Sequence, residues 1–211
     1  MLEVTSLKDA KEVLFQKKVV IFDLDDTLFS EKDYVKSGYK KIAESFPQIE
    51  DMQQKLWLAF ESGHKAINYV LENEGLFSEE NLNKALTVYR SHVPEIELYE
   101  DAKTLISILK ESGVRLGIIT DGRPEGQKAK IKALGIESLF EKIIITDELG
   151  GLSFRKPSPE AFKIMQDFFN VPFEDMVYVG DNPEKDFIAP SELKMDSVYF
   201  VNPEGLYSKR I

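Results

Sequence analysis

Two aspartates that follow a short apolar run near the start of the chain are the first residues able to do chemistry. Asp23 and Asp25 stand two positions apart in the segment FDLDDTLF at 22–29. In extended backbone, side chains two residues apart point to the same side. A pair of carboxylates on one side can supply a nucleophile and an acid–base group. This pair is therefore the centre of a candidate reaction site.

Four further polar residues occur where later apolar runs end or where helices are predicted to begin. They are Thr120, Lys156, Asp181 and Asp186. Ligands of open α/β sheets bind in the crevice beyond the carboxyl ends of the strands. We therefore expect these four residues to gather with the aspartate pair at one edge of a sheet.

Such a group of carboxylates favours a bound cation. Carboxylates that lie close together repel one another, and a hard divalent ion such as Mg²⁺ relieves the repulsion through oxygen ligands. Lys156 supplies a point charge for an anionic substrate, and the Thr120 hydroxyl can donate to phosphoryl oxygens. This combination is suited to phosphoryl transfer through an aspartyl-phosphate intermediate.

The elements that would position these residues are short apolar runs alternating with amphipathic stretches. The runs are rich in Val and Ile and do not alternate with polar residues, which is typical of strands buried on both faces. They span 19–23, 116–121, 142–146, 176–181 and 197–201. Helices are expected at 101–113, 126–136 and 158–170. The alternation predicts a doubly wound α/β domain with a mainly parallel sheet.

One long segment breaks this rhythm. Between residues 30 and 96 no strand is predicted, and helices are expected at 31–45, 50–61, 63–73 and 79–92. The segment is predicted to form a small all-helical cap domain inserted into a core formed by 1–29 and 97–211. The first 17 residues are expected to form a short helix before the sheet begins.

At these residues the sequence resembles the haloacid dehalogenase (HAD) superfamily of phosphohydrolases, whose core is Rossmann-like. The four motifs of that family occur in order, and the resemblance spans roughly residues 18–201. They are DLDDT at 23–27, Thr120, Lys156 in RKPSPEAF, and GDNPEKD at 180–186. The helical segment resembles the family's cap, which the family inserts after its first motif.

The resemblance implies a role for each acidic residue. Asp23 would be the nucleophile, and Asp25 would protonate the leaving oxygen and then act as base toward water. Asp181 would bind Mg²⁺ together with Asp23 and the backbone carbonyl of Asp25, while Asp186 would be a weaker or water-mediated metal ligand.

The resemblance also implies contacts with the substrate. Thr120 would hydrogen-bond the phosphoryl group, and Lys156 would neutralise the nucleophile and the transferring group. Asp121 stands beside the second motif and is either a substrate contact or an Asp-Gly turn residue. Arg123 and Gln127 either face the substrate or lie on a solvated loop or helix face.

The second acid distinguishes reactions within the superfamily. The dehalogenases lack an acid at the position of Asp25, because a halide needs no proton on leaving, so its presence favours cleavage of a phosphate ester. Asp26 and Thr27 fit phosphatases better than the sugar phosphomutases, which usually read DGV there. Two alternatives stay open: a phosphomutase of the same fold, and a non-catalytic interaction module.

Composition excludes several other classes. The chain of 211 residues carries 27 Lys and Arg against 37 Asp and Glu, so a net charge of -10 argues against nucleic acid as a partner. The chain contains no Cys and two His, which excludes disulfides and thiolate chemistry and disfavours a zinc site. No apolar run is long enough to span a membrane.

The expected protein is a cytoplasmic Mg²⁺-dependent phosphatase. Its substrate would be a small soluble phosphomonoester such as a sugar phosphate, an acyl-sugar phosphate or a nucleotide, over which the cap would close. The oligomeric state is left open by the sequence.

Overall fold

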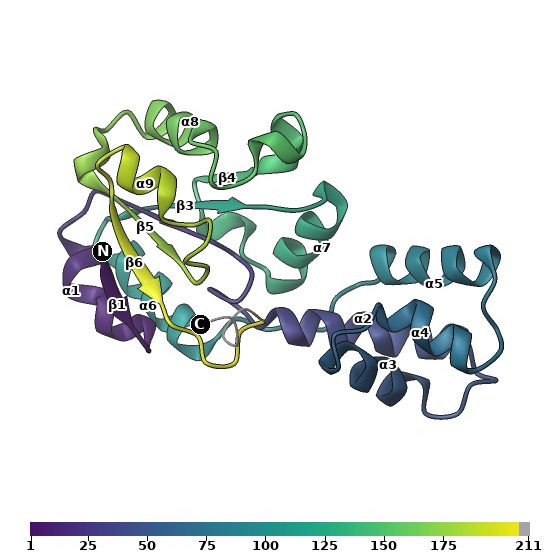
Figure 1. The fold of residues 1–211 in the computed structure, drawn as a ribbon. Helices are drawn as coiled ribbons and strands as arrows, with labels where there is room; N and C mark the ends of the chain where they lie inside the picture. Colours follow the sequence, from purple (N-terminus) through teal and green to yellow (C-terminus); the bar gives the residue numbers. More distant parts are fainter. Residues whose placement is uncertain (207–211) are drawn as a thin grey trace. The chain divides into compact units, whose positions relative to one another are not determined.

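The computed structural model of the chain describes residues 1–206 and divides into two compact units (Figure 1). The first unit consists of Met1–Glu31 together with the chain from Glu97 onward. The second unit is the intervening segment, Lys32–Ile96. Each unit has its own buried apolar core, and we describe them in turn.

A six-stranded sheet forms the centre of the first unit. Its strands are β1 (Leu2–Val4), β2 (Val19–Phe22), β3 (Arg115–Thr120), β4 (Lys142–Ile145), β5 (Met176–Gly180) and β6 (Asp196–Phe200). They are ordered β1-β6-β5-β2-β3-β4, and every pairing is parallel. All residues of β2 and β5 are buried, as expected for strands covered on both faces. The predicted doubly wound parallel sheet is confirmed.

The first strand differs from the expectation for the N-terminus. Leu2–Val4 form an edge strand whose residues pair in register with Val198–Phe200 of β6, and a 3₁₀ turn, η1 (Leu7–Ala10), and a short helix, α1 (Lys11–Phe15), follow it. The prediction of a single short helix was therefore wrong for these residues. Three residues are too few to show a periodicity of their own, and their conformation is set by pairing with a distant strand.

Helices cover both faces of the sheet. Figure 1 shows α8 (Glu160–Phe169) and α9 (Ile188–Glu192) on one face, with α1 and α6 (Glu100–Glu111) on the other. From α8, the side chains of Phe162, Met165 and Phe169 share one buried cluster with Ile119 and Tyr178 of the sheet. Packing of this kind fixes the strands in register and thereby fixes the positions of the loops that follow them.

The remaining elements of the first unit are one helix and short turns. Helix α7 (Pro124–Leu134) begins with proline at its first position and ends at Gly135, whose φ of 66° suits glycine. The 3₁₀ turns are η2 (Glu137–Leu139), η3 (Thr146–Leu149), η4 (Leu152–Phe154) and η5 (Phe173–Asp175).

The second unit is helical. It is formed by α2 (Glu31–Ser45), α3 (Met52–Glu61), α4 (Ala66–Asn73) and α5 (Glu79–Ser91). Its core contains Ile42, Phe46, Leu56 and Leu71, none of which has exposed surface. Trp57 and Phe60 of α3 are partly buried and pack against this core.

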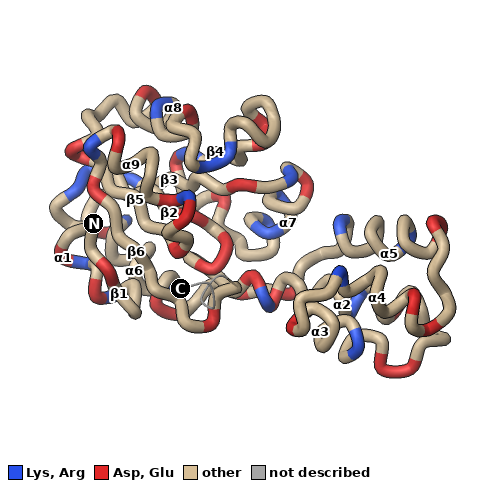
Figure 2. Tube along the Cα trace, viewed as in Figure 1, with Lys and Arg blue, Asp and Glu red and all other residues tan. Residues whose placement is uncertain are grey.

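Charged residues of both signs are interspersed along the chain in each unit (Figure 2). Within residues 1–206, none of the helices combines the length and apolar character that crossing a bilayer requires.

Candidate active site

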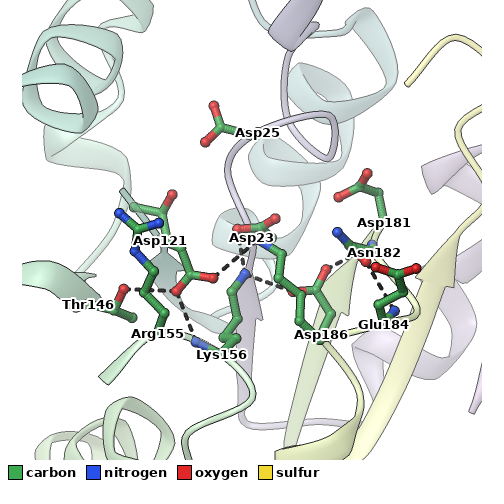
Figure 3. Close-up of polar contacts among 12 residues, drawn as sticks. Asp23, Asp25, Asp121, Thr146, Arg155, Lys156, Asp181, Asn182, Glu184 and Asp186 are labelled. Atoms are coloured by element: carbon green, nitrogen blue, oxygen red, sulfur yellow. Dashed lines mark hydrogen bonds and ion pairs between the residues drawn. The ribbon is translucent and has the colours of Figure 1, made fainter. Parts of the chain in front are cut away.

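Three carboxylates meet where β2 and β5 end. Asp23 directly follows β2, whereas Asp181 and Asp186 lie in the loop after the neighbouring strand β5. One oxygen from each carboxylate lies within 4.8 Å of the others, and all three residues are buried (Figure 3). Adjacent parallel strands bring their carboxyl ends together, which explains how residues 158 positions apart share one site.

Lys156 lies against this cluster. Its Nζ is 2.7 Å from Asp23 Oδ1 and 2.8 Å from Asp186 Oδ1, and it donates to the Tyr178 hydroxyl at 2.7 Å (Figure 3). These contacts engage all three N–H bonds of the ammonium group. Burial lowers the pKa of Lys156, but the carboxylates of Asp186 and Asp23 raise it well above its usual value. Lys156 is therefore a permanent positive charge at the site.

One ammonium group does not balance the three acids. Burial raises the pKa of Asp23 to about 6 against the opposing charge of Lys156. Burial, together with the charges of Asp23 and Asp186, raises the pKa of Asp181 to about 9. Carboxylates whose ionised forms are disfavoured in this way fit a divalent cation with oxygen ligands. The donor set of Asp23, Asp181 and Asp186 therefore fits a bound Mg²⁺ ion.

The position of Asp186 depends on a glycine. Its Oδ2 accepts a hydrogen bond of 2.9 Å from the backbone N–H of Asn182. A Cβ atom at Gly180 would lie 2.5 Å from that same Oδ2, closer than real Cβ contacts allow. The last residue of β5 therefore has to be glycine for Asp186 to fold back against the strand.

Asp25 stands clear of this cluster. In Figure 3 its carboxylate points away from Asp23. One oxygen is 2.6 Å from Lys130 Nζ, and the other accepts from Gln127 Nε2 at 2.9 Å. The Asp25 side chain is thus held by α7 and is not part of the three-carboxylate cluster.

Thr120, the last residue of β3, is fully buried beside the same helix. Its Oγ1 accepts a hydrogen bond of 2.5 Å from Gln127 Nε2. Gln127 is buried rather than on a solvated helix face, whereas Arg123 is exposed.

Asp121 forms a junction between loops. Its Oδ1 accepts from Thr146 Oγ1 at 2.8 Å and from the backbone N–H of Lys156 at 3.1 Å (Figure 3). Lys185 Nζ is 3.1 Å from its Oδ2. Burial opposes ionisation of Asp121, but Lys156 and Lys185 lower its pKa below the usual value. The carboxylate therefore orders the loop that carries Lys156, and both of its oxygens are engaged within the protein.

Asp26 and Thr27 support the turn after β2. Asp26 adopts a left-handed backbone conformation with φ of 53°, and its carboxylate accepts from the backbone N–H groups of Glu31 and Leu206. Thr27 Oγ1 is 3.4 Å from Asp181 Oδ1. Asp26 thus shapes the turn rather than joining the acidic cluster.

Three functional candidates were missed from the sequence. In the sequence, Tyr178 is indistinguishable from an apolar strand residue. Lys130 is one of several lysines in a segment predicted to be an amphipathic helix. Lys185 lies inside GDNPEKD and could have been singled out by that position. The spacing of Gln127 and Lys130, three residues apart, places both on one face of α7.

Comparisons with known proteins identify relatives of this chain. The family model for haloacid dehalogenase-like hydrolases matches residues 20–200. A glyceraldehyde 3-phosphate phosphatase from Methanocaldococcus jannaschii is 28% identical over 198 residues, covering 86% of this chain and 83% of that protein. A phosphoglycolate phosphatase from Colwellia psychrerythraea is 29% identical over 195 residues, covering 88% and 84%.

A solved structure shares the fold. It is a HAD hydrolase from Bacillus subtilis bound to magnesium, with a TM-score of 0.62 and 22% identity, covering 87% of this chain and 86% of that one.

Proposed function

The chain belongs to the haloacid dehalogenase-like hydrolase family, and from this premise we propose a Mg²⁺-dependent phosphatase that acts through an aspartyl-phosphate. The enzyme class, phosphoric monoester hydrolase, follows from the family and from phosphatase relatives that align with most of the chain. The observation that carries the finer proposal is the burial of Asp23 between Lys156 and the other two acids. The helical unit, Lys32–Ile96, is proposed as the family's cap because it directly follows the first motif in the chain.

Asp23 is the proposed nucleophile. One of its carboxylate oxygens forms a bond to phosphorus while the bond between phosphorus and the ester oxygen breaks. Lys156 holds the Asp23 carboxylate in place and balances negative charge on the transferring group. Asp23, Asp181 and Asp186 would hold Mg²⁺, which would supply further positive charge near the phosphoryl oxygens.

Asp25 is the proposed acid and base. In its protonated form it donates its proton to the departing ester oxygen, and its carboxylate then accepts a proton from water. That water attacks phosphorus, breaks the bond to Asp23 and releases inorganic phosphate. The location of the Asp25 side chain outside the acidic cluster suits a group that serves the leaving oxygen rather than the metal. Because Thr120 Oγ1 accepts from Gln127, its own O–H hydrogen is left to donate to a phosphoryl oxygen.

We propose a small phosphomonoester as the substrate. The named relatives act on glyceraldehyde 3-phosphate and phosphoglycolate, so these two esters are the first to test, followed by larger sugar phosphates and nucleotides.

Release of inorganic phosphate from such a panel tests the proposal. We expect turnover that requires Mg²⁺, stops with a chelator and falls by at least about a thousandfold in Asp23→Asn, because that change removes the nucleophile. An equal rate in carefully purified Asp23→Asn would eliminate Asp23 as nucleophile. Turnover that requires a bisphosphate activator and yields an isomer instead of phosphate would identify a mutase.

A further inference from the structure

One helix contacts both the proposed acid and the proposed phosphoryl-binding hydroxyl. Gln127 Nε2 lies 2.5 Å from Thr120 Oγ1 and 2.9 Å from Asp25 Oδ2. One turn further along α7, Lys130 Nζ lies 2.6 Å from Asp25 Oδ1. Both carboxylate oxygens of Asp25 are therefore held by donors from a single rigid element.

Both N–H bonds of the Gln127 amide are used in these contacts. Its two N–H bonds account for Thr120 and Asp25, and the opposite orientation would place the amide oxygen against a carboxylate. Gln127 is only 3% exposed, and its side chain packs close to Gly122, where a Cβ atom would lie 3.2 Å from it. Gln127 therefore acts on neighbouring side chains rather than on the substrate.

The Lys130 side chain is also held by neighbouring side chains of the protein. Its side chain is 6% exposed, which is unusual for lysine, and its second acidic neighbour, Glu31, is at 4.0 Å. An ammonium group buried in this way is held by the carboxylate that it contacts, and it fixes that carboxylate in turn.

We propose that Gln127 and Lys130 are positioning residues that set the orientation of Asp25 relative to Thr120 for protonation of the leaving oxygen. This inference rests on the proposed function, because it assigns the two residues to the acid step of that reaction. Loss of Lys130 affects the acid but leaves the contact between Gln127 and the Thr120 hydroxyl in place. Loss of Gln127 affects the acid and also the hydroxyl that contacts the phosphoryl group.

The leaving group of the ester separates this role from a structural one. An aryl phosphate such as 4-nitrophenyl phosphate departs as a stable anion and needs little protonation, whereas an alkyl phosphate such as glycerol phosphate depends on an acid. For Lys130→Met we expect kcat on the alkyl ester to fall by about tenfold or more, with less than about a threefold loss on the aryl ester. Lys130→Arg should recover most of the kcat lost on the alkyl ester. Gln127→Leu should slow the hydrolysis of both esters.

The matched control is Lys132→Met, which changes an exposed lysine on the same helix and should leave both rates unchanged. A double-mutant cycle completes the test. In an Asp25→Asn background, Lys130→Met should lower kcat on the alkyl ester by less than about twofold, because the acid that Lys130 positions has already been removed. This double variant removes both members of the Asp25–Lys130 ion pair, so neither of the two is left as an unpaired charge.

The outcomes separate the two proposals. Equal losses on both esters in Lys130→Met, or the same loss in the Asp25→Asn background, would overturn the positioning role while leaving the phosphatase intact. A folded wild-type protein that hydrolyses neither these two esters nor any ester of the panel described above with Mg²⁺ would overturn the proposed function and this inference together.

Discussion

Lys156 and Asp186 form an ion pair in which neither side chain has any exposed surface, with Nζ 2.8 Å from Oδ1. A buried pair of this kind is weak evidence for stability by itself, but removal of one partner leaves a charge that neither water nor protein compensates. Here the same lysine also faces Asp23, so its loss would leave two buried carboxylates without their cation. The stability of the strand ends is therefore linked to the groups proposed for catalysis.

Lys156→Met should be strongly destabilising in metal-free protein. We expect the free energy of unfolding to fall by about 3–5 kcal/mol, the range found when one partner of a buried ion pair is removed. Urea denaturation followed by circular dichroism measures this change. The control is Lys163→Met, which removes an exposed ion pair with Glu160 and should cost no more than about 1 kcal/mol. Equal losses in the free energy of unfolding for the two variants would contradict the conclusion that burial makes the Lys156 ion pairs important for stability.

Tyr178→Phe should have a smaller effect that is confined to the polar end of the side chain. The ring stays packed against Phe162, but Lys156 loses its phenol partner at 2.7 Å. An N–H group left buried without a partner costs about 1–3 kcal/mol. We also expect a lower kcat, because the orientation of Lys156 toward Asp23 becomes less restricted. The urea midpoint and phosphate release are measured on one preparation, and an unchanged value of both would show that the phenol is dispensable.

Predictability from the sequence differed between the ends of strands and their interiors. Asp23, Thr120 and Asp181 directly follow apolar runs, so strand topology alone brings them to one edge of the sheet. Tyr178 lies within such a run, where its hydroxyl is indistinguishable from the polar tip of a core residue. Its contact with Lys156 depends on how the loop before α8 folds, and this is a tertiary property.

The same limit applies to α7 and to the N-terminus. Lys130 is one of several lysines in an amphipathic segment, and only the packing of that helix beside Asp25 distinguishes it. The strand Leu2–Val4 exists because it pairs with β6, a contact between sequence positions that lie far apart.

Gly180→Ala tests the close approach of Asp186 to β5. The added Cβ would lie 2.5 Å from Asp186 Oδ2, so the carboxylate has to move away from its bond with Asn182. Overpacking of this kind costs about 1–3 kcal/mol, and we expect weaker Mg²⁺ binding as well. In an Asp186→Ser background the cost should shrink, because the clashing carboxylate is gone. Calorimetric titration measures Mg²⁺ binding, and thermal unfolding measures stability. If Gly180→Ala lowered stability equally with and without Asp186→Ser, the clash would involve a group other than the Asp186 carboxylate.

Removal of metal should make stability depend on pH in a defined direction. The pKa of Asp181 is raised from 3.8 to about 9 by burial and by its acidic neighbours, and burial raises that of Asp23 from 3.8 to about 6. The folded state therefore binds these protons more tightly than the unfolded chain does. The resulting stability is fully present below about pH 4 and is lost as pH rises through 6 for Asp23 and 9 for Asp181.

The Tm of chelator-treated protein should accordingly fall between about pH 5 and about pH 9, and Asp181→Asn should flatten the decline because its amide does not ionise. Mg²⁺ stabilises the ionised carboxylates, so the increase in Tm that it causes should grow with pH in the wild type and be much smaller in Asp181→Asn. Exposed Asp167→Asn serves as the charge-matched control, since it alters net charge equally without touching the cluster. If Asp167→Asn flattened the profile as much as Asp181→Asn, general repulsion in an acidic protein would account for the pH dependence, and the acidic cluster would not.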